Sequence, residues 1–179
     1  MKPVEIIAQA IGIIAMVFNI LSFQGKKQKT VIALQLLGTS LFAVNFFLLG
    51  AMVGSILNLL AALRSVLFLY KDKLKAEHKL WFAAFVACYI ATYVLNFTVF
   101  SKEPTAFNLI IEILPVIGMV SLDVGYRMKT SAAIRKCGLV NAPLWLVYNL
   151  VTGSWGAITC DVLTLSSIIL GMFRMDKKR

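Results

Sequence analysis

Asn58 and Asp161 are the two residues in this sequence whose type and position point most clearly to chemistry. Each lies inside a long apolar stretch, and an aromatic residue precedes each by sixteen positions, Phe42 in the first case and Trp145 in the second. An amide and a carboxylate can hydrogen-bond a polar solute, while aromatic rings can pack against its apolar face. The pattern predicts a binding pocket.

The same residues have structural interpretations. Amide side chains often hydrogen-bond between membrane helices, and aromatic rings often serve only to pack them. Asp161, however, would lie about 10 Å below the outer surface at 1.5 Å per residue, and Glu112 would lie at a similar depth. Carboxylates inside a membrane usually have a function, and an apolar environment favours their protonated form. Asp161 and Glu112 are therefore the candidates for proton coupling.

The composition places these residues in a membrane protein. Of 179 residues, 60% are apolar and 15% are charged, and the mean hydropathy is +0.85. Seven apolar stretches approach the roughly 20 residues that a helix needs to cross a bilayer, and lipid leaves the backbone no alternative to a helix. The predicted spans are residues 4–23, 31–49, 52–70, 80–99, 106–125, 133–151 and 155–173.

Basic residues between the spans predict the orientation. Fifteen of the 18 Lys and Arg residues would lie on one side of the membrane, whereas Lys2 and Lys102 would lie on the other and Arg64 inside a span. The fifteen fall within residues 26–29, 71–79, 127–136 and 174–179. Because positive residues stay in the cytoplasm, we predict an external N-terminus and a cytoplasmic C-terminus.

The sequence also contains an internal repeat. Residues 6–71 align without a gap with residues 109–174, at an offset of 103 positions and with eleven identities. Chemically related residues coincide as well, namely Gln9/Glu112, Phe23/Tyr126, Phe42/Trp145, Asn58/Asp161 and Lys71/Arg174. Each unit holds three spans, so one further span between the units is needed for both to face the same way.

The predicted fold is therefore all-α, with seven transmembrane helices in a 3-1-3 arrangement of parallel repeats. Residues 1–73 would form the first three-helix bundle and residues 74–104 a linker helix with its flanking loops. Residues 105–179 would form the second bundle and a basic C-terminal tail. In transporters built from such repeats, the binding site lies between the halves.

Several features of this sequence carry a resemblance to known families. The 3-1-3 order, Ser22-Phe23-Gln24 before a lysine-rich loop, and the aromatic residue sixteen positions ahead of a buried amide resemble the SWEET, SemiSWEET and PQ-loop (MtN3-like) transporters. More closely, NFFLLG at 45–50 followed by Arg64, and LPVIG at 114–118, resemble the YgjV family of bacterial inner-membrane proteins. The resemblance implies a multi-pass protein of the bacterial inner membrane.

The resemblance also implies a site and an activity. The implied pocket positions are Phe42, Asn45, Asn58, Trp145, Tyr148 and Asp161. The implied activity is alternating-access transport of a small polar solute such as a sugar, an amino acid or a related metabolite, with proton coupling as one option. The sequence departs from the superfamily in lacking its Pro-Gln pair, and in placing an acid at Asp161, which argues against a neutral pocket for sugars alone.

The main alternative is a membrane scaffold that does not transport, whose basic cytoplasmic face binds an acidic protein or anionic lipid. An enzyme is not expected, because Gly-x-Ser-x-Gly, HExxH and P-loop motifs are missing and His78 is the only histidine. Cys88, Cys137 and Cys160 lack metal-ligand spacing. We expect no metal and no cofactor. The expected partners are membrane lipid and a solute rather than nucleic acid, and the oligomeric state stays open.

Three charged residues near the inner ends of spans have structural interpretations. Arg64 could extend to the cytoplasmic surface or form an ion pair. Asp123 and Arg127 are four positions apart, a spacing that predicts a local ion pair on one helix.

Overall fold

The computed structural model of the chain describes residues 3–49, 52–128, 130–152 and 155–176. Its long helices are α1 (Pro3–Ser22), α2 (Gln28–Leu48), α3 (Met52–Leu69), α5 (Lys79–Thr98), α6 (Ala106–Arg127), α7 (Ser131–Thr152) and α8 (Trp155–Gly171). A single turn, α4 (Lys71–Leu74), follows α3, and a short π-helix, η1 (Met172–Asp176), continues α8. Each long helix begins and ends within three residues of a predicted span.

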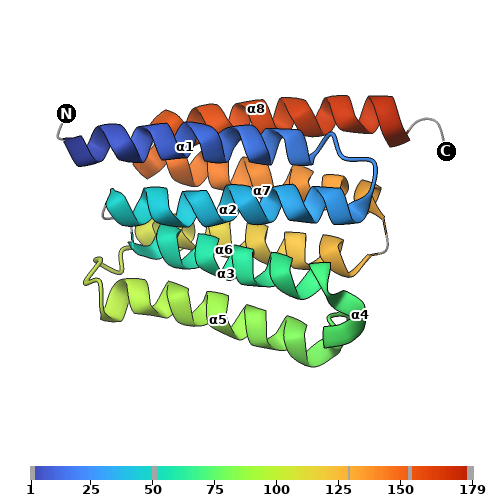
Figure 1. Cartoon of the computed structure of the whole chain (residues 1–179). Helices are drawn as coiled ribbons and strands as arrows, with labels where there is room; N and C mark the ends of the chain where they lie inside the picture. The colour runs from blue at the N-terminus through green and yellow to red at the C-terminus, as the bar shows by residue number, and fades with distance from the viewer. Residues whose placement is uncertain (1–2, 50–51, 129, 153–154, 177–179) are drawn as a thin grey trace.

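The long helices run alternately in opposite directions, so the N-terminus and the C-terminus lie at opposite ends of the bundle (Figure 1). The α1–α2 and α6–α7 connections and the turn α4 lie at the end where the chain finishes. Residues 23–27 and 70–78 carry many of the lysines, so we call this the lysine-rich end. The prediction that this end faces the cytoplasm stays a prediction.

Five helical segments are long and apolar enough to cross a membrane within the described part of the chain. They are Pro3–Ser22, Gln28–Leu48, Lys79–Thr98, Ala106–Arg127 and Ala157–Arg174. Helix α3 contributes a shorter apolar segment, Val53–Leu69. Helix α7 has 22 residues but is more polar, because Arg135, Lys136 and two asparagines lie in it. An apolar outer surface agrees with contact with lipid, and Ile13, Phe47 and Ile110 each have more than half of their surface exposed.

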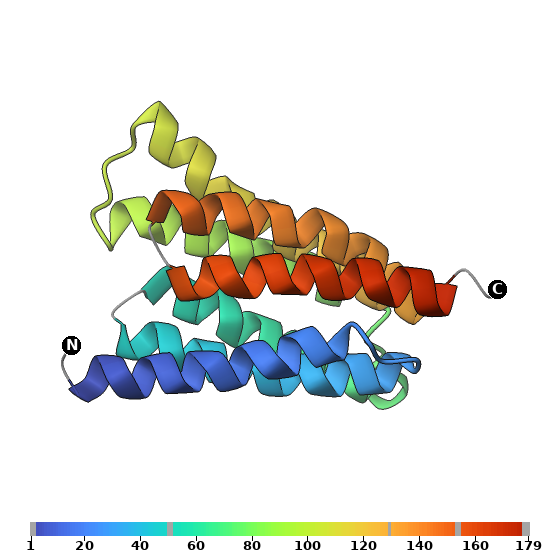
Figure 2. The same ribbon diagram turned by 90° about the horizontal axis from the view of Figure 1, so that it is seen from above.

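The helices pack in two sets of three that follow the same order. Helix α2 packs against α1 and α3, and α7 packs against α6 and α8. Helix α8 also contacts α1, while α5 contacts α3 and α6 (Figures 1 and 2). We call α1, α2 and α3 the first helix set, and α6, α7 and α8 the second helix set.

The larger apolar core lies toward the lysine-rich end and joins the two helix sets. Phe23, Ile32 and Phe68 of the first half pack there with Tyr126 and Ile168 of the second. Phe68 meets the Tyr126 ring edge-on, with 5.4 Å between ring centroids. A second core around Leu57, Tyr89, Val116 and Met119 joins α3, α5 and α6. Both cores border the cavity described next.

Candidate functional site

A cavity of about 110 Å³ lies between the two helix sets. This volume holds several water molecules or one small solute. Its lining comes from α1, α2, α3, α6, α7 and α8, and no residue of α5 in the described part of the chain borders it. The lining residues are Asn19, Phe23, Gln35, Thr39, Phe42, Phe46, Asn58, Ala61, Arg64, Met119, Leu122, Tyr126, Asn141, Ala142, Trp145, Asn149, Ala157, Cys160, Asp161 and Thr164.

The lining follows the internal repeat. Fourteen of these twenty residues form seven pairs separated by 103 positions. The pairs are Asn19/Leu122, Phe23/Tyr126, Thr39/Ala142, Phe42/Trp145, Phe46/Asn149, Asn58/Asp161 and Ala61/Thr164. Corresponding positions of the two halves therefore meet around the same space.

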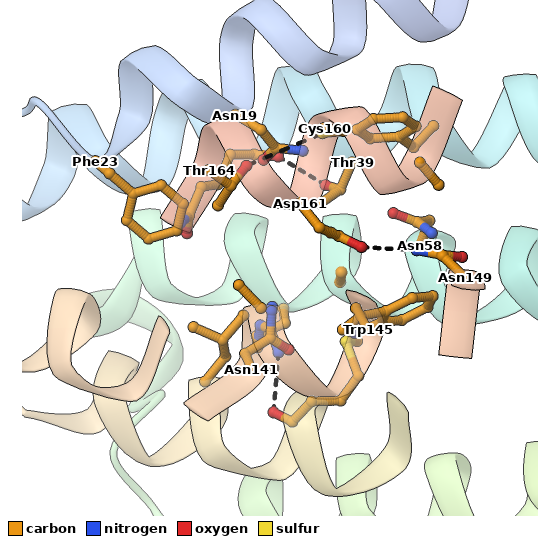
Figure 3. Close-up of a pocket in the computed structure, with 18 of the residues that line it drawn as sticks. Asn19, Phe23, Thr39, Asn58, Asn141, Trp145, Asn149, Cys160, Asp161 and Thr164 are labelled. Atoms are coloured by element: carbon orange, nitrogen blue, oxygen red, sulfur yellow. Dashed lines mark hydrogen bonds between the residues drawn. The ribbon is translucent and has the colours of Figure 1, made fainter. Parts of the chain in front are cut away.

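Four of the six predicted pocket residues lie on this cavity: Phe42, Asn58, Trp145 and Asp161. Figure 3 shows Asp161 beside Asn149 and Asn58, with Trp145 next to them. The structure thus brings together the two polar residues and the two aromatic residues that the repeat singled out.

The other two predicted residues do not line the cavity. Asn45 is buried, and its amide nitrogen donates a hydrogen bond to the carbonyl oxygen of Ala8 at 2.6 Å, which ties α2 to α1. Tyr148 packs edge-on against Trp145, with 5.8 Å between ring centroids. Both residues support neighbouring parts of the structure.

Asp161 is held by an amide from the adjacent helix. The Asn149 side-chain nitrogen donates to the Asp161 Oδ2 atom at 2.9 Å (Figure 3). The Asn58 side-chain nitrogen donates to the Gly54 carbonyl of its own helix, also at 2.9 Å. Within the described residues no ion pair involves Asp161. Each amide nitrogen thus makes one hydrogen bond inside the protein, and the Asp161 carboxylate at the cavity can accept further hydrogen bonds.

Arg64 borders the cavity on the side of the lysine-rich end and is almost fully buried. Its Nη1 atom donates to Asp123 Oδ1 at 2.8 Å and to the Met119 carbonyl at 3.3 Å. The Tyr89 hydroxyl donates to the same Asp123 oxygen at 3.3 Å. The guanidinium also lies 4.7 Å from the centre of the Tyr126 ring. Of the two interpretations of Arg64, the structure supports the ion pair.

The predicted ion pair between Asp123 and Arg127 is wrong. Asp123 is buried and pairs with Arg64 on α3, whereas the Arg127 guanidinium lies 5.3 Å from the centre of the Phe82 ring. The physical reason is burial, because a charge inside the protein needs an opposite charge that is buried with it. The partner on another helix therefore prevails over the one four positions away.

Glu112 lies away from the cavity. Its buried carboxylate pairs with the Lys102 ammonium group, which belongs to the connection between α5 and α6. Of the two acids predicted for proton coupling, Asp161 alone faces the cavity. The role of Glu112 in proton coupling stays a prediction.

Hydrogen bonds between the two helix sets gather toward the lysine-rich end. Gln24 donates to the Ser167 hydroxyl at 2.8 Å, and this hydroxyl donates to the Ile20 carbonyl at 2.7 Å. Arg135 donates to the Gly25 carbonyl at 3.0 Å, and Gln28 to the Met128 carbonyl at 2.6 Å.

The Tyr126 hydroxyl also donates to the Gln35 side chain, from α6 to α2. These hydrogen bonds between the two sets lie on the lysine-rich side of Asn58 and Asp161. The halves are therefore joined by polar contacts at one end of the cavity.

Several lining residues were not predicted, notably Asn149, Asn141 and Gln35. A signal exists for Asn149, because it follows Trp145 by four positions and therefore lies on the same face of its helix. Its partner in the repeat, Phe46, follows Phe42 by the same interval.

An all-helical bundle with an apolar outer surface and a polar cavity between its helices is the architecture of a multi-pass membrane protein. A family model described as "Bacterial inner membrane protein" (Imp-YgjV) matches residues 6–179. The chain belongs to this family and is a protein of the bacterial inner membrane. Neither a curated protein nor a solved structure matches it. The resemblance to the YgjV family is thereby confirmed, while the place of the chain in the SWEET and PQ-loop superfamily stays a prediction.

Proposed function

We propose that this protein transports a small polar solute across the inner membrane by alternating access. The observation that carries the proposal is the arrangement of the cavity, where seven pairs of residues separated by 103 positions surround a carboxylate, amides and aromatic rings. Binding sites between repeated halves are typical of transporters whose halves move against each other.

The proposed arrangement is 3-1-3. The first helix set and the second helix set would be parallel repeats, related by an axis along the membrane normal, and α5 would be the linker that reverses the chain between them. This assignment is supported by the matching packing order of the two sets. The external N-terminus and cytoplasmic C-terminus are part of the proposal.

In this mechanism the two helix sets rock about the level of Asn58 and Asp161. The hydrogen bonds of Gln24, Gln28 and Arg135 would close the cavity toward the lysine-rich end in the conformation described here. A typical hydrogen bond contributes about 1 kcal/mol net. Breaking such a set would therefore cost a few kcal/mol, an amount that new contacts at the opposite end and a bound solute can offset.

Asp161 has a second proposed role, as the site of a coupled proton. It faces the cavity, and its contact with Asn149 is a neutral hydrogen bond rather than an ion pair. If protonation of Asp161 drives transport, any transport that the Asp161→Asn variant retains should not change with pH. A pH dependence identical to that of the wild type would remove this role.

The first experiment is accessibility to a membrane-impermeant thiol reagent, in a background without Cys88, Cys137 and Cys160. A cysteine at position 58 should react, because Asn58 borders the cavity. The matched control is Ala15→Cys, since Ala15 has no exposed surface and does not line the cavity. Labelling at position 58 alone supports a solute pathway.

The competing function is the scaffold, which the lysines of residues 23–27 and 70–78 at the lysine-rich end favour. It predicts no labelling at position 58. It also predicts that replacing Lys26, Lys27 and Lys29 together abolishes activity in cells, whereas a transporter should keep its counterflow activity in proteoliposomes after that change.

A further inference from the structure

We propose that the solute is a small organic cation, and that Asp161 is its counter-ion in the cavity. This inference rests on the proposed transport function and names the chemical class of the solute. Three features of the cavity lead to it: its charge, its hydrogen-bond acceptors and its aromatic rings.

The charge of the cavity is unbalanced. Among the described lining residues, Arg64 and Asp161 are the basic and the acidic side chain. Arg64 is neutralised by Asp123, whose carboxylate oxygen lies 2.8 Å from it on the far side of the cavity wall. Asp161 has the neutral Asn149 amide at 2.9 Å and no ion pair within the described residues. A partly buried carboxylate without a counter-charge is destabilising, and a solute cation would supply that charge.

The cavity offers hydrogen-bond acceptors from both halves of the chain. Asn58 donates one of its two amide N–H groups to Gly54, and its side-chain oxygen is an acceptor at the cavity. The Asp161 carboxylate, which accepts from Asn149, can accept further hydrogen bonds. An ammonium group has donors and no acceptor, so it complements this set.

Aromatic rings lie on the same cavity. Phe42, Phe46 and Trp145 border it, and the edge-on contact with Tyr148 holds the Trp145 ring in place. Aromatic faces attract organic cations, with tryptophan the strongest, and the attraction grows when water is excluded. An anionic solute is disfavoured, since the Arg64 guanidinium is already occupied by Asp123 and the Met119 carbonyl.

The test compares ligands of equal shape and different charge. Choline is a cation, and 3,3-dimethylbutan-1-ol is its neutral counterpart, with a carbon atom in place of the charged nitrogen. Ethanolamine, a cation at neutral pH, and the neutral ethylene glycol form a smaller pair. Binding to the purified full-length protein can be followed by calorimetry, and transport by counterflow in proteoliposomes with glucose as a neutral polar probe. We expect at least one of the two cations to bind tenfold or more tightly than its neutral counterpart.

The matched variants are Asp161→Asn, which removes the proposed counter-ion, and Asp72→Asn, which removes an exposed carboxylate in α4. The first should lose cation binding at least tenfold, and the second should keep it. The comparison of ligands on the wild-type protein needs no variant, so the inference remains testable if Asp161→Asn fails to fold.

The outcomes separate the two proposals. If glucose or the neutral analogues bind and move as well as the cations, or if Asp161→Asn keeps full cation binding, the inference about charge is wrong while transport stands. If a folded protein binds and moves none of these probes, the transport function and the inference that rests on it are both overturned.

Discussion

The buried ion pair between Arg64 and Asp123 allows a quantitative prediction about stability. The Arg64→Met variant would remove the partner at 2.8 Å and leave the Asp123 carboxylate with the Tyr89 hydroxyl, which lies 3.3 Å from Oδ1. The Oδ2 atom of Asp123 is already buried without a hydrogen-bond partner. Removing one member of a buried pair typically costs about 3 to 5 kcal/mol, because the remaining charge is uncompensated.

The double variant Arg64→Met/Asp123→Leu should recover most of this loss, since replacing a buried pair by apolar residues of similar volume is often nearly neutral. The expected coupling energy between the two positions is therefore at least about 3 kcal/mol. The assay is unfolding of the purified protein in detergent, where the single variant should lower the midpoint temperature by roughly 10 °C for a chain of this size.

An exposed ion pair of the same chain provides the control. Lys71 and Glu77 lie 3.7 Å apart, with side chains that are 23% and 49% exposed. Lys71→Gln should cost less than about 1 kcal/mol, as is usual for exposed pairs. If Arg64→Met costs no more than this control, or if the double variant is less stable than either single variant, the reasoning about the buried pair is refuted.

Three further predictions follow from close contacts. Gly171→Ala should weaken the contact between the two helix sets at the lysine-rich end, because its Cβ atom would lie 2.6 Å from the Phe23 carbonyl oxygen. A cysteine at position 39, which lines the cavity, should then be labelled more from the cytoplasmic side, and unchanged labelling would contradict this. Asn45→Ala should lower stability by about 1 to 2 kcal/mol without changing solute affinity, because its amide bonds to α1. Lys102→Gln should lower stability by roughly 1 to 3 kcal/mol, and thermal unfolding should show recovery when Glu112→Gln is added.

Much of the fold could be predicted from the sequence, because apolar runs and the basic residues that flank them delimit helices in a membrane protein. The main difference in boundaries is at α2, which begins at Gln28 rather than at residue 31. Lysine and glutamine are good helix formers, so the helix starts before the apolar run does. The turn α4 was not predicted, since its three charged residues and one leucine carry no apolar periodicity.

The site could be predicted only where the repeat marks it. Phe42 and Trp145 occupy equivalent positions, and their helices present the cavity face again four residues later, at Phe46 and Asn149. Asn45 was included by resemblance alone, and its side chain bonds to α1 instead. At 3.6 residues per turn, positions three and four residues after a cavity residue are displaced to opposite sides of it, by about 60° and about 40°, and the neighbouring helix then decides what each contacts.

The ion pair of Arg64 with Asp123 illustrates what local spacing misses. The two residues are 59 positions apart and meet only because α3 packs against α6. Spacing along one helix indicated Arg127 as the partner of Asp123, whereas packing between helices determines the actual one.

The difference between Asn58 and Asp161 has a consequence for the symmetry of the cavity. A dimer of two identical three-helix chains can place only an even number of carboxylates around its two-fold axis, either none or two at equivalent positions. A single chain with diverged halves can place one, as the pair Asn58/Asp161 does here. The charged end of a solute would then be drawn toward one half of the cavity, a preference that a symmetric dimer cannot impose.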